Sequence, residues 1–155
     1  MTVLDLLELP AALPSYTPIV GLDLGENTIG VAVSDATRSV ASPLGLIRKT
    51  KFTDDATALF RLLESRGATG MVIGLPVNMD GSEGPRCQSS RAFARNILRL
   101  REVPIAFWDE RMSTMAINRM LIDEADMNRA RRAEVVDKAA AAWILQGALD
   151  RLRNG

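Results

Sequence analysis

Histidine is absent from this chain of 155 residues, and cysteine occurs once, at Cys87. The lack of histidine removes the commonest general base of enzymes and the commonest zinc ligand. A single cysteine cannot form a disulfide within the chain, which fits a reducing cytoplasm. Histidine-based catalysis and the usual zinc sites are therefore excluded, and carboxylate oxygens remain as metal ligands.

Net charge and long apolar runs are also lacking. Lys+Arg and Asp+Glu both total 19, so any surface that binds nucleic acid must be a local patch. The longest weakly polar run, residues 139–149, is too short to span a bilayer. Aromatic residues make up only 5% of the chain, which favours reading of a nucleic-acid backbone and shape over base stacking.

What is present indicates one domain. Hydrophobic residues make up 47% of the chain, enough for one core with two sides at this length. Residues 1–18 contain three prolines, and acids stand where a signal peptide needs basic residues. We expect this segment to be a loosely attached arm outside the core, followed by a single domain over residues 19–155.

The apolar pattern changes period several times along that domain. Strands are expected at 18–25, 28–35, 39–49, 70–76 and 103–110, and helices in a segment that ends at Gly67 and at 85–101, 113–124 and 134–153. The first three strands have short connections and should be antiparallel, whereas strands separated by helices become parallel neighbours. The prediction is an α/β domain whose mixed five-stranded sheet has helices on both faces, a layout typical of an RNase H-like fold.

Three carboxylates stand at informative positions in this layout. Asp23 ends the first strand, Glu110 ends the last, and Asp137 begins the alanine-rich final helix. A buried charge costs several kcal/mol, roughly, unless it is paired or holds a metal. Because ligands collect at the carboxyl ends of such strands, we expect these acids to converge there and to hold Mg²⁺ or Mn²⁺.

Each acid also has a purely structural interpretation. Asp23 can cap a turn, Asp137 can favour a helix start through the macrodipole, and Asp109-Glu110-Arg111 can be a solvated strand end. Side chains alternate along a strand, so only one of Asp109 and Glu110 can point toward a given face. Glu110 is the preferred ligand because its side chain is longer, and Asp109 is the second choice.

Polar residues near these strand ends are candidates for binding nucleic acid. They share a place in a loop or helix start beside the expected site, and they are Asn78, Arg86, Arg111, Arg129, Arg131 and Arg132. A run of charge is often only a solvated face, and this alternative stays open for the helix at 85–101.

Four blocks of the chain, in order, resemble the YqgF (RuvX-type) family of pre-16S rRNA nucleases, also described as Holliday junction resolvases. The blocks are GLDLGENTIGVAVSD, VIGLPVNMDGSEGP, DERMST and VVDKAAAAWILQ. The resemblance implies an RNase H-like fold, a divalent metal, a cytoplasmic nuclease and maturation of the 5′ end of 16S rRNA. It places the family's acidic residues on Asp23, Glu110 and Asp137.

One departure concerns the residues after Gly25. Family members usually have a basic residue there, whereas this chain has Glu26 and Asn27, which puts substrate affinity in doubt. Other functions remain open at this point: a resolvase of branched DNA, a non-catalytic module that binds nucleic acid or the ribosome, and an ATP-binding domain of the actin type. The chain is expected to act as a monomer or homodimer.

Overall fold

The computed structural model describes residues 2–112 and 129–154, with side chains outside the description at 129–138. Its elements in chain order are η1 (Leu6–Glu8), η2 (Pro10–Ala12), β1 (Ile19–Leu24), β2 (Thr28–Ser34), β3 (Ala41–Arg48), α1 (Phe52–Arg66), β4 (Gly70–Leu75), α2 (Pro85–Leu100), β5 (Ile105–Asp109), η3 (Glu110–Met112) and α4 (Arg129–Asn154). The helix expected at 113–124 lies outside the described residues.

The five strands form one mixed sheet in the order β3-β2-β1-β4-β5, which confirms the predicted α/β layout. β1 pairs antiparallel with β2 and parallel with β4, and Leu22 lies opposite Val31 on one side and Ile73 on the other. β1 is therefore the central strand, and both of its edges are covered by neighbours.

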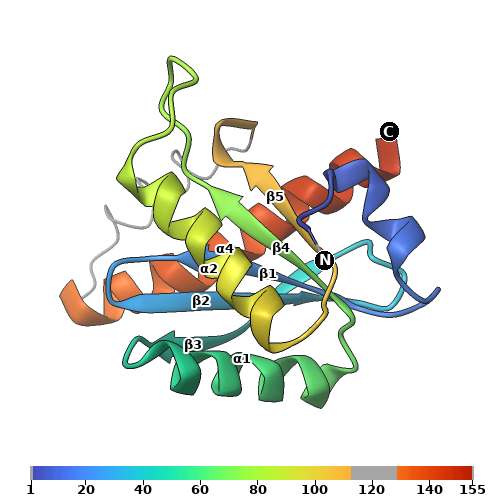
Figure 1. Cartoon of the computed structure of the whole chain (residues 1–155), viewed down its shortest axis with the longest axis horizontal. Coiled ribbons are helices and arrows are strands. Elements are labelled where there is room, and N and C mark those ends of the chain that lie inside the picture. Colours follow the sequence, from blue (N-terminus) through green and yellow to red (C-terminus); the bar gives the residue numbers. More distant parts are fainter. Residues whose placement is uncertain (1, 113–128, 155) are drawn as a thin grey trace.

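Helices cover both faces of this sheet (Figure 1). On one face, α1 and α2 contribute Leu59 and Ile97 to a core cluster with Leu22 of β1. On the other face, α4 contributes Ile144 and Leu145 to a second cluster. Alternate residues of the central strands face opposite layers, so these strands are apolar almost throughout.

Local signals explain most of the helix boundaries. Gly67 ends α1 with a φ of 65°, a conformation that suits glycine, and its N–H donates to the carbonyl oxygen of Glu64. α2 begins at Pro85, where the missing N–H costs no hydrogen bond. α4 already includes Arg129, five residues before the predicted start at residue 134, because the sequence RARRAE consists of good helix formers.

The N-terminal segment is packed against the domain, contrary to the expectation of a loosely attached arm. Leu9 and Leu13 belong to the core cluster beneath α4, and Leu9 is fully buried. The N–H of Leu4 donates to the carbonyl oxygen of Ile105 at 2.8 Å, next to a β-bridge at the edge strand β5. The prolines do prevent a long helix, but the leucines between them supply apolar anchors.

Leu9 therefore offers a test of this packing. We expect Leu9→Ala to lower the free energy of unfolding by about 2–4 kcal/mol, because it opens a cavity in the core. Leu7→Ala removes the same atoms from a side chain that is 52% exposed, and should change it by less than about 0.5 kcal/mol. Urea unfolding of both variants measures the difference; equal effects would contradict the buried position of Leu9.

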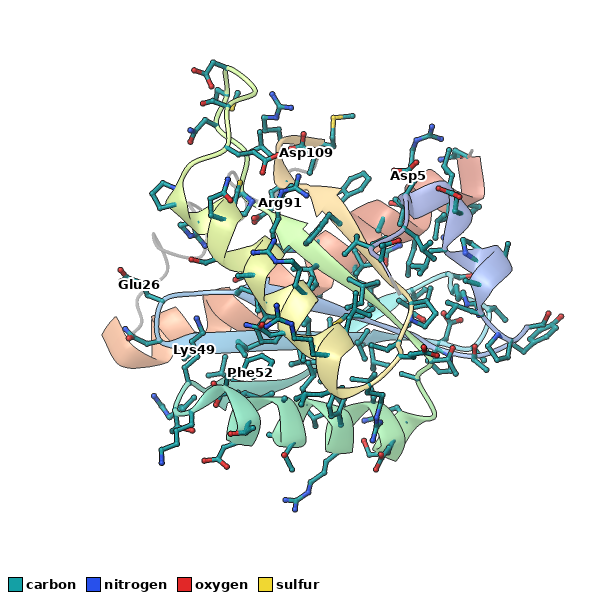
Figure 2. The ribbon with its side chains drawn as sticks, viewed as in Figure 1. Asp5, Glu26, Lys49, Phe52, Arg91 and Asp109 are labelled. Atoms are coloured by element: carbon teal, nitrogen blue, oxygen red, sulfur yellow. The ribbon has the colours of Figure 1, made fainter. Side chains whose placement is uncertain are left out.

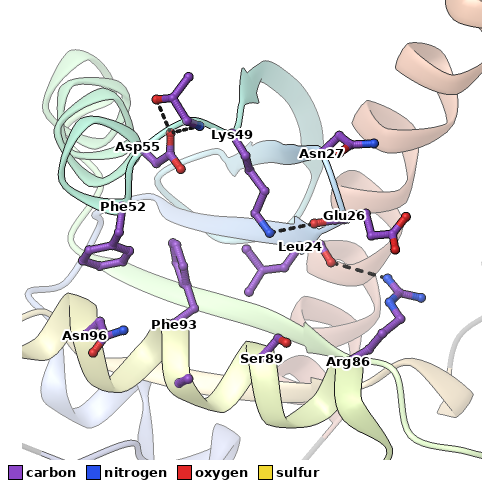
Figure 3. Close-up of a pocket in the computed structure, with 13 residues that line it drawn as sticks. Leu24, Glu26, Asn27, Lys49, Phe52, Asp55, Arg86, Ser89, Phe93 and Asn96 are labelled. Carbon is purple, nitrogen blue, oxygen red and sulfur yellow. Dashed lines mark hydrogen bonds between the residues drawn. The ribbon is translucent and has the colours of Figure 1, made fainter.

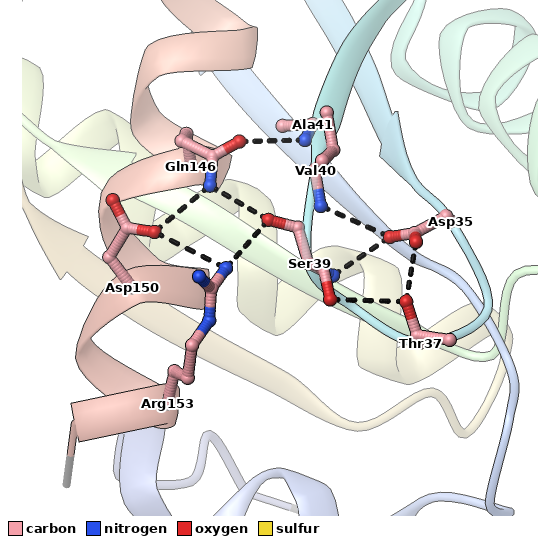
Figure 4. A network of polar contacts seen from close by, with 8 residues as sticks. All are labelled: Asp35, Thr37, Ser39, Val40, Ala41, Gln146, Asp150 and Arg153. Atoms are coloured by element: carbon pink, nitrogen blue, oxygen red, sulfur yellow. Dashed lines mark hydrogen bonds and ion pairs between the residues drawn. The ribbon is translucent and has the colours of Figure 1, made fainter.

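A polar network joins the β2–β3 loop to the C-terminal part of α4 (Figure 4). The side chain of Gln146 accepts from the N–H of Ala41 at 2.8 Å and donates to the carbonyl oxygen of Ser39 at 3.0 Å. Arg153 donates to the same oxygen at 2.8 Å. These contacts attach this end of α4 to the sheet edge formed by β3.

Asp35 organises the loop side of this network. Hydrogen bonds from the Thr37 hydroxyl and from the N–H groups of Val40 and Ser39 lower the pKa of Asp35 to about 2. Because the pKa is lower in the folded state, its contribution to stability is present above the ordinary value and is lost as the pH falls toward about 2. Asp35→Asn should therefore flatten the acid limb of a plot of stability against pH, measured by thermal unfolding between pH 2 and 6. An unchanged acid limb would contradict this role.

Among the described residues, no helix is both long and apolar enough to cross a membrane.

Candidate active site

Asp23 lies on the central strand, on the face that α4 covers. Only 3% of the surface of Asp23 is exposed to solvent. Gly21, two positions earlier, faces α4 so closely that a Cβ atom there would lie 2.6 Å from the Cβ of Leu145. Since residues two apart share a face of a strand, Asp23 points to the α4 side as well. Its strand neighbour in β2 is Gly30, which adds no side chain to this region.

Glu110 reaches the same face from the other half of the sheet. It begins η3 directly after β5, one residue beyond the last strand residue, so the expected strand over 103–110 is shorter than predicted. A Cβ atom built on Gly74 would lie 3.4 Å from the carboxyl carbon of Glu110 and would also collide with Ile144 of α4. The missing side chain of Gly74 thus leaves room for Ile144, and the Glu110 carboxylate lies next to it.

The register of the sheet brings these two acids near each other. Leu22 is paired with Ile73, so the next residues, Asp23 and Gly74, lie at the same level on neighbouring strands. Neighbouring strands are roughly 5 Å apart. The carboxylates of Asp23 and Glu110 therefore lie on one face, close to the carboxyl ends of β1 and β4.

Asp137 belongs to α4, whose backbone the structure describes at this position, whereas its side chain lies outside the described part. It precedes Ala141 by one turn and Ile144 by two turns, so the three residues share one side of the helix. Ala141 and Ile144 both approach the sheet, at Gly21 and Gly74 respectively. The helix backbone thus carries Asp137 toward the same face, roughly 10 Å along the axis from Ile144.

Asp109, the second-choice ligand, is engaged in a different interaction. The Arg111 guanidinium donates to Asp109 Oδ2 at 2.7 Å, and the Arg111 N–H donates to Oδ1 at 2.9 Å. The side-chain hydrogen bond from Arg111 lowers the pKa of Asp109 below its ordinary value. This geometry leaves Glu110 as the stronger candidate of the pair.

The β4–α2 loop stands beside Arg111. The side-chain nitrogen of Asn78 lies 3.0 Å from the Ser82 hydroxyl, and Gly81 closes the turn with a φ of 91°. A Cβ atom on Gly81 would lie 3.7 Å from Arg111 Nη1. The structure therefore brings the β4–α2 loop, which carries Asn78, next to Arg111 beyond the carboxyl ends of β4 and β5.

The other basic candidates are placed differently. Arg86 lies at the start of α2, where its Nη2 is 3.4 Å from the carbonyl oxygen of Leu24. The sequence suggested a connecting loop for Arg129, Arg131 and Arg132, but the structure places all three inside α4, because their segment continues the helix. Their side chains lie outside the described residues.

Sequence reasoning missed Lys49, which approaches the turn where the usual basic residue is lacking. Its Nζ donates to the carbonyl oxygen of Gly25 at 2.8 Å, and its N–H donates to that of Asn27 at 2.9 Å. Figure 2 shows Lys49 and Glu26 at the same end of the sheet. A positive charge is therefore present at this turn, supplied by the β3–α1 connection.

The donor set suits a hard divalent cation. Carboxylate oxygens, which Asp23 and Glu110 provide, are the preferred ligands of Mg²⁺ and Mn²⁺. Within residues 2–112 and the described side chains of α4, no group of three acidic or sulfur ligands occurs. A third carboxylate would have to come from Asp137 or another residue outside that description.

Comparison with known proteins gives consistent results across the chain. A family model described as "RuvX: Holliday junction resolvase" matches residues 17–151. A protein of Phenylobacterium zucineum named "Putative pre-16S rRNA nuclease" is 81% identical over 155 residues, which cover 99% of each chain. A Caulobacter vibrioides protein of the same name is 66% identical, also with 99% of each chain covered.

Among solved structures, RuvC of Thermus thermophilus in complex with a Holliday junction substrate matches with a TM-score of 0.52. The match covers 88% of this chain and 96% of that one, at 10% sequence identity. A second structure of Thermus thermophilus RuvC matches with the same TM-score. At this identity the likeness concerns the fold, which is the RNase H-like arrangement predicted from the element order.

Proposed function

The chain belongs to the RuvX family, and from this premise we propose that it is a metal-dependent endonuclease that hydrolyses phosphodiester bonds during maturation of the 5′ end of pre-16S rRNA. The observation that supports the proposal is the strand register, which puts Asp23 level with Gly74, the residue that the Glu110 carboxyl group lies against on the same face of the sheet. We place its work in the cytoplasm, where precursor rRNA is found.

The proposed catalytic and metal-binding residues are Asp23, Glu110 and Asp137, acting with Mg²⁺ or Mn²⁺. When bound, such cations lower the pKa of an attacking water and stabilise the negative charge on the leaving 3′ oxygen. The backbone of Asp23 is held by strands on both sides, and its side chain is almost completely buried. Ile144 of α4 packs directly beside Gly74 on this face.

Substrate positioning falls to polar groups around the strand ends. Asn78 and Arg111 stand above β4 and β5, and Arg86 and Lys49 stand at the β1–β2 turn. Cations at these places can contact phosphates on either side of the carboxylates. Arg91 and Arg101 are stacked over the rings of Phe107 and Phe60, so we assign them to the structure of α2 and not to the substrate.

Resolution of branched DNA is the second candidate function, and the description of the matching family model favours it. Both reactions hydrolyse a phosphodiester bond and need the same carboxylates. The difference lies in the shape of the substrate that the surrounding basic groups accept.

The proposal is tested with purified protein, Mg²⁺ or Mn²⁺, and two labelled substrates: a 16S rRNA fragment with its 5′ precursor extension, and a four-way DNA junction. We expect cleavage of the RNA at internal positions and loss of cleavage when EDTA removes the metal. Preferential cleavage of the junction would favour the resolvase function. Binding of RNA without cleavage of either substrate, with or without metal, would identify a non-catalytic module and refute the nuclease proposal.

A further inference from the structure

A cleft opens on the face of the sheet opposite α4, between the β1–β2 turn, the start of α1 and α2 (Figure 3). Its volume is about 710 Å³. Asp23 and Glu110 do not line it, so it is separate from the proposed metal site. The lining combines two cations, two aromatic rings and two polar side chains of α2: Lys49, Arg86, Phe52, Phe93, Ser89 and Asn96.

Both cations contact the β1–β2 turn, at the end of the cleft nearest to β1 (Figure 3). Lys49 donates to the carbonyl oxygen of Gly25, and Arg86 lies 3.4 Å from that of Leu24. Carbonyl oxygens carry no net charge, so these contacts orient the cations without neutralising them. Within the described part of the chain, neither cation forms an ion pair, in contrast to Arg91. This end of the cleft is therefore suited to a phosphate group.

Two acids also line the cleft, but neither occupies its middle. Asp55 accepts hydrogen bonds from the N–H and the hydroxyl of Thr50, at 3.0 and 3.3 Å, which fixes its carboxylate at the start of α1. Figure 3 shows Glu26 directed away from the aromatic rings. The space between the cations and the rings is thus left to a ligand.

The rings form the apolar part of the lining. Phe52 and Phe93 pack edge to face, with ring centroids 5.6 Å apart and planes at 79°. Both residues are half-buried, so part of their ring surface faces the cleft. An aromatic ring stacks with any nucleic-acid base, and Ser89 and Asn96 can form hydrogen bonds at the edge of that base.

We propose that this cleft binds one unpaired nucleotide of the substrate strand, with its phosphate at Lys49 and Arg86 and its base against Phe93. The inference rests on the proposed nuclease function. The lining of the cleft includes Leu24 and Gly25, which follow Asp23 by one and two residues, roughly 3 and 7 Å along the strand. A single strand that crosses this end of the sheet can reach both the carboxylates and the cleft, whereas a paired base cannot enter.

The experiment measures binding and not cleavage. The full-length Asp23→Asn protein, without divalent metal, is titrated into a short fluorescein-labelled single-stranded RNA and followed by fluorescence anisotropy. Lys49→Gln and Phe93→Leu in this background should each weaken binding by about tenfold. Lys51→Gln removes the same charge from an exposed residue outside the cleft, and should change the affinity by less than twofold.

A duplex of the same sequence provides the second comparison, because Phe93→Leu should leave its affinity unchanged. Equal losses for Lys49→Gln and Lys51→Gln, or equal losses on duplex and single strand, would overturn the proposal in favour of a general electrostatic field. Displacement of the RNA by free adenosine monophosphate at micromolar concentration would also overturn it, since the cleft would then be a site for a free nucleotide. Lys49 is an exposed residue, so its variant remains informative if Phe93→Leu does not fold.

These results are independent of the nuclease assay. Wild-type protein that fails to cut any substrate refutes the proposed function even if the cleft binds single strands. If the protein cuts RNA but substitutions at Lys49 and Phe93 leave its RNA affinity unchanged, only the proposed nucleotide site in the cleft is refuted.

Discussion

Asp23→Asn should reduce the rate of cleavage by about 10³-fold, because metal catalysis contributes several kcal/mol to transition-state stabilisation and each 1.4 kcal/mol is tenfold in rate. The substitution keeps the size of a side chain that is almost completely buried and removes only its charge. Cleavage of the precursor RNA fragment under single-turnover conditions measures the loss.

A second readout separates metal binding from folding. A cation that binds only the folded state raises its melting temperature. We expect Mn²⁺ to raise the melting temperature of the wild-type protein and to have a much smaller effect on Asp23→Asn. Asp35→Asn makes the same chemical change in an exposed loop beyond β2 and should retain both cleavage and the Mn²⁺ effect. Full activity of Asp23→Asn would defeat the proposed site.

Gly21→Ala should strongly destabilise the fold, lowering the free energy of unfolding by about 3 kcal/mol. The added Cβ would lie 2.6 Å from the Cβ of Leu145 and 3.1 Å from the carbonyl oxygen of Ala141. Both atoms belong to or adjoin the backbone of α4, so the whole helix must move away. Denaturant unfolding measures the loss of stability.

The matched control is Gly45→Ala in β3, where the nearest atoms are the ends of the Leu62 side chain at 3.6 and 3.9 Å. That contact is ordinary, so stability should change by less than about 1 kcal/mol. If Asp137 and Asp23 act together as proposed, any folded Gly21→Ala protein should also lose activity, since a displacement of roughly 1 Å between them can cost about 100-fold. Unfolding curves that coincide for the two variants would show that α4 does not pack as closely on β1 as described.

Much of this architecture was predictable because its signals are local. The short turn at Gly25 predicted the antiparallel hairpin, the helical pattern ending at Gly67 predicted α1, and Pro85 marked the start of α2. The mixed sheet followed from the order of strands and helices, which leaves few arrangements.

The errors arose where long-range packing decides. Proline content suggested a loose N-terminal arm, but Leu9 and Leu13 find partners in α4, which lies far along the sequence. The contact of Lys49 with the turn at Gly25 could not be predicted from a local pattern. It arises because β2 pairs with β3, which brings Lys49 next to that turn.

In the candidate site, too, local signals were predictable from the sequence, whereas features set by long-range packing were not. Their positions at the ends of strands marked Asp23 and Glu110 as candidates, but the distance between them depends on the register of β1 and β4. Two glycines inside buried strands, Gly21 and Gly74, were the available signal for close approach, since glycine in a strand interior often marks such a contact. The position of the Asp137 side chain stays a prediction.

The two carboxylates described here belong to parts of the sheet that should open at different rates. Asp23 is on the central strand, whose amide hydrogens should exchange with solvent only through global unfolding, whereas Glu110 begins a single 3-10 turn after the edge strand β5. The N–H of Arg111 in that turn is held by a side-chain oxygen of Asp109 instead of by a strand partner. Brief local unfolding of η3 can therefore move Glu110 away while Asp23 stays in place. The candidate site can then lose and regain one carboxylate while the rest of the fold remains intact.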